Sequence, residues 1–138
     1  MKDNVSELRS KSANEPVAGF LGISLVDLQP GYAKVSIKIK PEHLNFNGLV
    51  FGGIIVAVID EAFAYATNSL VQPSYASQLN VHFINAPVVN DVLTAECWLL
   101  KSGHRVGISE MLVANQDGKL IAKATGTTIP VIREPDKK

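Results

Sequence analysis

The chain has 138 residues, which fits a single domain, and 46% of them are hydrophobic, enough to build a core. Its 13 basic and 13 acidic side chains cancel, so no overall field draws it to nucleic acid or to an anionic membrane surface. This balance argues against a nucleic-acid partner, whereas a ligand with a few phosphates needs only a local basic patch.

The N-terminal segment, residues 1–16, is polar and of mixed charge and lacks the apolar stretch of a signal peptide. The longest apolar run, residues 48–59, is too short to span a bilayer. Cys97 is the single cysteine, so an intramolecular disulfide is impossible, and its alternating neighbours favour strand packing over a nucleophile. These features predict a soluble cytoplasmic protein with no membrane partner.

The first elements are predicted from periodicity and turn residues. Residues 5–12 form a short helix, followed by an irregular stretch that includes Glu15 and Pro16. Residues 22–28 form a strand that ends at a Gln-Pro-Gly turn, and residues 32–40 alternate apolar and polar side chains as a strand with one wet face. A loop over residues 41–48 follows.

Residues 53–68 predict a helix that is apolar on nearly every side and must therefore be covered on most of them. Four strand-like segments follow, at residues 74–83, 92–102, 104–114 and 119–131, each separated by turn residues. The order indicates an α+β fold in which a largely antiparallel, curved sheet wraps one long central helix. We expect one domain over residues 1–138, with a core at about 18–130, an N-terminal extension at 1–17 and a charged tail at 133–138.

Two adjacent carboxylates, Asp60 and Glu61, interrupt the apolar helix. Carboxylates are seldom buried unless they are paired or functional, and burial raises a carboxyl pKa toward the range of a general base or a nucleophile. The alternative is that this side of the helix faces solvent or an ion pair. Periodicity alone does not separate the two interpretations.

Gly52 and Gly53 stand at the start of the same helix. Free backbone N–H groups and the positive end of the helix dipole stabilise a developing oxyanion, although a Gly-Gly pair also serves a simple tight turn. Asn45, in the preceding loop, can hold a water molecule or polarise a carbonyl, and asparagine is equally common as a turn residue.

Two segments form one motif: residues 43–53 (His-Leu-Asn-Phe-Asn-Gly-Leu-Val-Phe-Gly-Gly) and residues 60–69 (Asp-Glu-Ala-Phe-Ala-Tyr-Ala-Thr-Asn-Ser). This motif resembles the signature of hotdog-fold thioesterases, in particular the PaaI-like (phenylacetate-pathway) branch. That branch has an Asn-x-x-Gly-x-x-His-Gly-Gly loop and an acidic residue eight positions after the first glycine of the pair. Asn45, Gly48, Gly52, Gly53 and Asp60 occupy those places, and the resemblance extends over about residues 18–130.

One position departs from the pattern, because Phe51 stands where the family has histidine. Phenylalanine cannot donate a hydrogen bond, so the contribution of that histidine must be absent or supplied by Asn45 or Asn47. We expect four further residues to contact substrate rather than to react: Phe51, Gly53, Asn47 and Glu61.

The resemblance implies hydrolysis of an acyl-CoA thioester without metal or cofactor. Asp60 acts as general base or nucleophile, the Gly52 N–H polarises the carbonyl, and Asn45 positions water or substrate. It also implies sites shared between subunits, with a homodimer as the minimal unit and a homotetramer as the expected assembly. Independently, Gly52 and Asp60 are separated by ~12 Å along one helix, too far for both to act on one thioester from the same chain.

The sequence also allows other functions and leaves several reactive residue types without a catalytic role. A non-catalytic acyl-CoA-binding hotdog protein is the main alternative, and a hotdog dehydratase ranks below it because no His-Phe-Pro-Gly-type segment is present. The three histidines and Cys97 have no metal-ligand spacing, and His82 and His104 favour structural or surface roles. Lys101, His104 and Arg105 form a basic cluster that either contacts CoA phosphates or is a solvated turn.

Overall fold

The computed structural model describes residues 3–131, so the charged tail at 133–138 lies outside the described part. In chain order its elements are α1 (Asn4–Ser12), α2 (Pro16–Leu21), β1 (Ile23–Gln29), β2 (Tyr32–Lys38), the 3-10 helix η1 (Pro41–His43), α3 (Gly52–Asn68), β3 (Ser74–Phe83), β4 (Val92–Ser102), β5 (Gly107–Ala114) and β6 (Leu120–Pro130).

These elements match the predicted ones except near residues 16–21, where a helix replaces the expected irregular stretch. Pro16 starts α2, a position where its missing N–H costs nothing, and Gly22 ends the helix with a left-handed φ of 83°. The predicted strand at 104–114 begins only at Gly107, because residues 103–106 form the turn before it.

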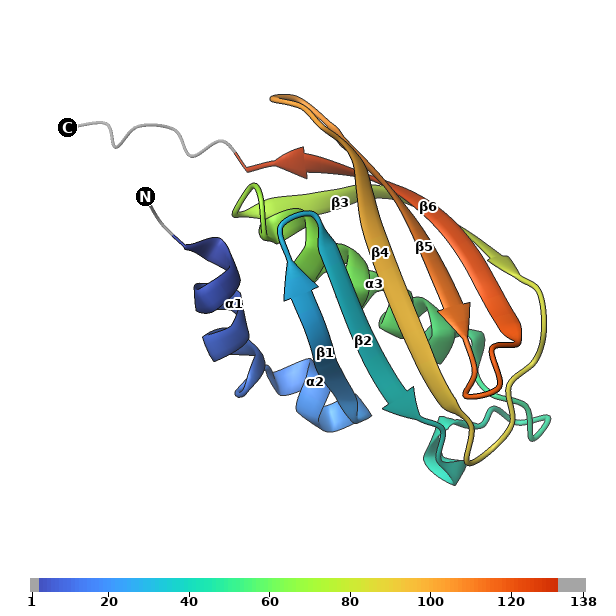
Figure 1. Cartoon of the computed structure of the whole chain (residues 1–138). Coiled ribbons are helices and arrows are strands. Elements are labelled where there is room, and N and C mark those ends of the chain that lie inside the picture. The colour runs from blue at the N-terminus through green and yellow to red at the C-terminus, as the bar shows by residue number, and fades with distance from the viewer. Residues whose placement is uncertain (1–2, 132–138) are drawn as a thin grey trace.

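The six strands form one antiparallel sheet in the order β1-β2-β4-β5-β6-β3. The sheet curves around α3, which lies along its concave side (Figure 1). Helices α1 and α2 lie next to β1 at one edge, whereas β3 is the strand at the opposite edge. The predicted α+β architecture is thereby observed in its central features.

The core lies between α3 and the sheet. Large apolar side chains from both layers are fully buried there, among them Val58, Ile59 and Phe63 from α3 and Val35 and Met111 from β2 and β5. As expected, α3 is covered on most sides, and one stripe of it remains open. Gly53, Asp60 and Ala64 are exposed on that stripe. No helix among residues 3–131 is long and apolar enough to cross a membrane.

Gly126 on β6 packs directly against α3. A Cβ atom added there would lie 2.5 Å from the ring of the buried Phe63 and 3.2 Å from the Gln78 backbone oxygen. Gly126→Ala is therefore expected to lower the free energy of unfolding by about 1–3 kcal/mol through overpacking. Urea denaturation checks this, with Gly19→Ala as control, because nothing lies within 4 Å of the added Cβ there. Equal loss of stability in both variants would contradict the packing argument.

Candidate active site

The loop before α3 is a tight turn organised by Asn45. Its Oδ1 accepts hydrogen bonds from the backbone N–H groups of Asn47 (2.9 Å) and Leu49 (3.2 Å). The Asn45 N–H donates to the Leu49 carbonyl at 2.7 Å, and a bridge joins Leu44 to Val50. The carbonyl oxygen of the side chain therefore serves the turn, which leaves the Asn45 Nδ2 group to meet a substrate.

Asn45 and Gly52 line the same cavity, of about 290 Å³, at the N-terminal end of α3. Its other walls come from Ile55 and from Phe83 and the segment after it. As first residues of the helix, Gly52 and Gly53 have N–H groups without an intrahelical acceptor. The structure thus brings together the predicted carbonyl-polarising group and the predicted positioning amide. Asn47 lies on the same turn with an exposed side chain.

Phe51 occupies the N-cap position of α3, where its side chain makes no capping hydrogen bond. Its backbone N–H donates to the His43 carbonyl at 2.9 Å, and its own carbonyl accepts from Ile54 N–H at 2.9 Å. The ring is 57% exposed and lies against Gly53, where it fills the space that a Cβ would need. A larger residue at Gly53 would displace this ring.

Asp60 lies on the exposed stripe of α3, and its pKa is raised above the ordinary value because packing around the helix removes part of its hydration. Glu61 is half-buried on the neighbouring side of the helix. Burial raises the pKa of Glu61 to about 8, and a hydrogen bond with Glu15 and the charges of Glu15 and Asp60 act in the same direction. Both carboxyl groups are therefore stronger bases than free ones.

Within one chain, Asp60 and the Gly52 cavity do not meet. The two residues are eight positions apart on α3, a rise of ~12 Å, and Asp60 is not among the residues that line the cavity with Gly52. The exposed stripe that carries Asp60 runs back to Gly53 at the start of the helix. One chain alone therefore keeps these two groups at separate places along α3.

The remaining residues singled out above lie elsewhere. Cys97 is fully buried in β4, and burial raises the pKa of its thiol to about 12, which makes it a poor nucleophile. His82 is exposed on β3. Lys101, His104 and Arg105 are exposed at the β4–β5 turn, whose Gly103 lies beside Thr67 near the C-terminal end of α3.

A residue that the sequence interpretation missed is His43. Its side chain is buried; Nδ1 accepts the Lys40 N–H at 3.0 Å, so Nε2 carries the proton and donates to the Leu21 carbonyl at 3.2 Å. The same residue accepts the Phe51 N–H through its carbonyl. His43 therefore ties the active-site loop to α2. A lone histidine in a loop gives no sequence signal for such a role.

The chain and its fold are similar to known proteins. A family model described as the thioesterase superfamily matches residues 47–122. The Escherichia coli acyl-coenzyme A thioesterase PaaI is 30% identical over 113 residues, which cover 82% of this chain and 81% of that protein. Human acyl-coenzyme A thioesterase 13 is 24% identical over 108 residues, covering 76% and 77%.

The solved structure of the E. coli PaaI protein from the phenylacetic acid degradation operon superposes with a TM-score of 0.88 at 27% identity and covers 92% of both chains. The chain therefore belongs to the thioesterase superfamily, as a thioester hydrolase of the hotdog fold. It is similar to PaaI, so the predicted fold, enzyme class and PaaI-like branch are confirmed. The roles of individual site residues stay predictions.

Proposed function

We propose that this protein hydrolyses acyl-CoA thioesters to the free acid and CoA, with Asp60 as the catalytic carboxylate. The observation that carries the proposal is the presence of two groups on the same helix. Asp60 has a carboxyl group of raised pKa, and the N–H groups at the start of α3 are unpaired. This combination supplies a base or nucleophile and an oxyanion-binding group, which thioester hydrolysis requires. The CoA substrate follows from the similarity to acyl-coenzyme A thioesterases.

The reaction then has two parts at the carbonyl carbon. The Gly52 N–H stabilises the oxygen as negative charge develops on it, and Asn45 Nδ2 positions the water or the thioester. Asp60 either removes a proton from the attacking water or attacks the carbon itself and is released by water. In both cases the C–S bond breaks and the CoA sulfur leaves as thiolate and is protonated, so that acid and CoA form without metal or cofactor.

The active unit in this proposal is a homodimer. The stripe of α3 that carries Asp60 is uncovered, and the neighbouring edge strand β3 exposes unpaired backbone groups and large apolar side chains such as Tyr75 (61% exposed) and Phe83 (55% exposed). A two-fold axis that sets two α3 helices antiparallel would place Gly52 and Asn45 of one subunit opposite Asp60 of the other. Pairing of dimers into a homotetramer is a further expectation.

The proposal also places the protein in the cytoplasm, because a chain with one cysteine forms no internal disulfide and suits a reducing compartment.

The test of function is release of free CoA thiol from a panel of short-chain, long-chain and aryl acyl-CoAs. Turnover of at least one class supports the thioesterase. Tight acyl-CoA binding with no turnover of any of them would instead support the non-catalytic alternative.

Phe51 is expected to act through packing rather than chemistry. Phe51→Ala should raise KM and change the preference for acyl length while turnover continues, because the ring covers the start of α3 without donating a hydrogen bond. Phe51→His, which introduces the family residue, should retain activity. Steady-state kinetics on two acyl-CoAs of different length measure both effects. Complete loss of activity in both variants would show that Phe51 is structural.

A further inference from the structure

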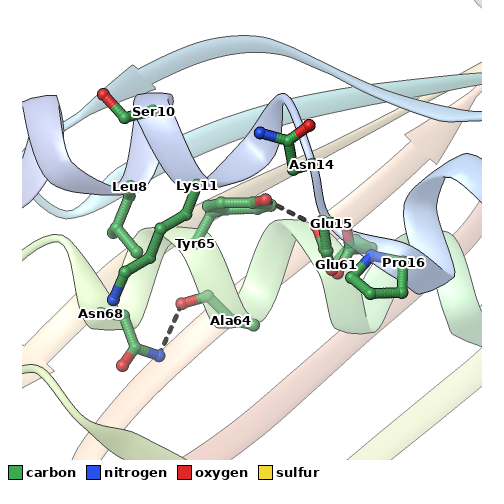
Figure 2. Close-up of a pocket in the computed structure, with 10 residues that line it drawn as sticks. All are labelled: Leu8, Ser10, Lys11, Asn14, Glu15, Pro16, Glu61, Ala64, Tyr65 and Asn68. Atoms are coloured by element: carbon green, nitrogen blue, oxygen red, sulfur yellow. Dashed lines mark hydrogen bonds between the residues drawn. The ribbon is translucent and has the colours of Figure 1, made fainter.

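A second and larger cavity, of about 670 Å³, lies between α1 and the C-terminal half of α3. Its volume falls within the ~300–1,000 Å³ of small-molecule sites. Leu8, Pro16 and Tyr65 give it apolar walls, and Glu15 and Glu61 lie together at one end. Figure 2 shows the phenol of Tyr65 directed at this end, below the connection between α1 and α2.

The acidic end of the cavity is formed by two carboxyl groups, Glu15 and Glu61, which both line it. Tyr65 Oη donates to Glu15 Oε1 at 2.6 Å, and Glu61 lines the same cavity as Glu15. The pKa of Glu61 is raised to about 8, first by burial and then by the neighbouring carboxyl group of Glu15. The pKa of Tyr65 is also raised, first by burial, so its hydroxyl remains a neutral donor.

The nearest basic side chain on the wall points elsewhere. Lys11 of α1 lines the cavity, but its Nζ lies 3.0 Å from Glu7 Oε1, one helical turn earlier. In Figure 2 the Lys11 side chain extends toward Asn68, at the end of the cavity away from Glu15. The groups that face Glu61 are therefore Glu15 from the α1–α2 connection and Tyr65 and Asp60 from α3, all of which favour a cation at this end.

The cavity also borders the proposed catalytic carboxylate. Glu61 follows Asp60 directly, and Ala64 both lines the cavity and lies on the exposed stripe one turn after Asp60. A thioester placed at Asp60 therefore has this cavity on one flank, where a group smaller than CoA can enter. The acyl part of the substrate is the group of suitable size.

We propose that this cavity binds the acyl group and that Glu15 and Glu61 select acyl groups carrying a positively charged amino group. The proposal rests on the proposed thioesterase activity. An ammonium between the two carboxyl groups displaces the proton of Glu61 into solvent and makes charge-assisted hydrogen bonds in a partly desolvated site. A methyl group there leaves the carboxyl groups without a new partner, and a carboxylate adds repulsion.

The test compares two substrates that differ only in the terminal group, 6-aminohexanoyl-CoA and heptanoyl-CoA. We expect kcat/KM to be roughly tenfold higher for the amino substrate, the effect of one charge-assisted bond. In Glu61→Gln, and separately in Glu15→Gln, this ratio should fall toward one. Each amide retains the shape of its carboxyl group, and circular dichroism checks that both variants fold.

A binding measurement separates this role from a structural one. Titration of 6-aminohexanoyl-CoA into the Asp60→Asn variant, in two buffers of different ionisation enthalpy at pH 7, should show release of a proton that heptanoyl-CoA does not release. An equal kcat/KM for the two substrates, a preference for heptanoyl-CoA, or the absence of proton release would overturn the proposal. Absence of turnover with either substrate or any other acyl-CoA would instead reject the proposed function.

Discussion

Asp60→Asn is expected to lower kcat of thioester hydrolysis by ~10²-fold or more while the protein stays folded. Carboxylate and amide have nearly the same shape, and Asp60 lies on the exposed stripe of α3, so packing is preserved. The amide can neither accept the proton of the attacking water nor act as an effective nucleophile. Release of free CoA, measured at saturating substrate, checks the loss.

The matched control is Asp117→Asn, since Asp117 is exposed in the turn between β5 and β6. It makes the same chemical change far along the chain from α3 and should retain wild-type activity.

The wild-type pH profile adds a second readout. Because the pKa of Asp60 is raised, activity should fall with acid at a pH above the ordinary aspartate value of 3.8. Wild-type turnover by Asp60→Asn would transfer the role to Glu61 or discard the mechanism.

Subunits that carry Asp60→Asn and subunits that carry Gly52→Pro should be inactive separately and active when refolded together. Proline suits the first position of a helix and removes the N–H that the oxyanion needs. Phe51, the residue before it, has φ −58° and ψ 125°, close to the polyproline II conformation that is compatible with a following proline. A Cβ at Gly52 would meet Phe83 only at an ordinary contact distance of 3.6 Å.

In an equal mixture, random pairing makes half of the dimers mixed, and each mixed dimer has one intact site. The expected activity is about a quarter of that of the wild type. Refolded single variants serve as controls, with their oligomeric state measured by sedimentation. If both variants dimerise and the mixture remains inactive, the site does not combine these two groups from different subunits. An active wild-type monomer under assay conditions would contradict the dimer itself.

The long central helix and the strands were predictable because their patterns are long and regular. Residues 32–40 alternate apolar and polar side chains, and the apolar run after Gly53 has no continuous polar face, so each segment points to one kind of structure. Helix α2 was not predictable in this way. It has six residues, too few to show a period, and its only signals are Pro16 and Gly22 at its ends.

The sequence predicted which residues form the candidate site, but it did not predict which residues surround them. The loop motif placed Asn45 and Gly52 together, and the structure shows them in one cavity. The sequence left open whether Asp60 is buried or faces solvent, because periodicity describes an apolar helix without saying how far a sheet reaches around it, and the structure shows it exposed. The contact of Glu15 with Tyr65 was missed, since it joins residues 50 positions apart in sequence.

The imidazole of His43 links helix α2 to the loop that precedes α3. It holds the last carbonyl of α2 on one side and the Lys40 N–H on the other, while its own backbone holds Phe51 at the entrance to α3. Helix α2 thus contacts the loop before α3 through His43, and α1 forms part of the wall of the larger cavity. A sequence change in α2, remote from any reacting atom, reaches the Gly52 N–H through a single ring.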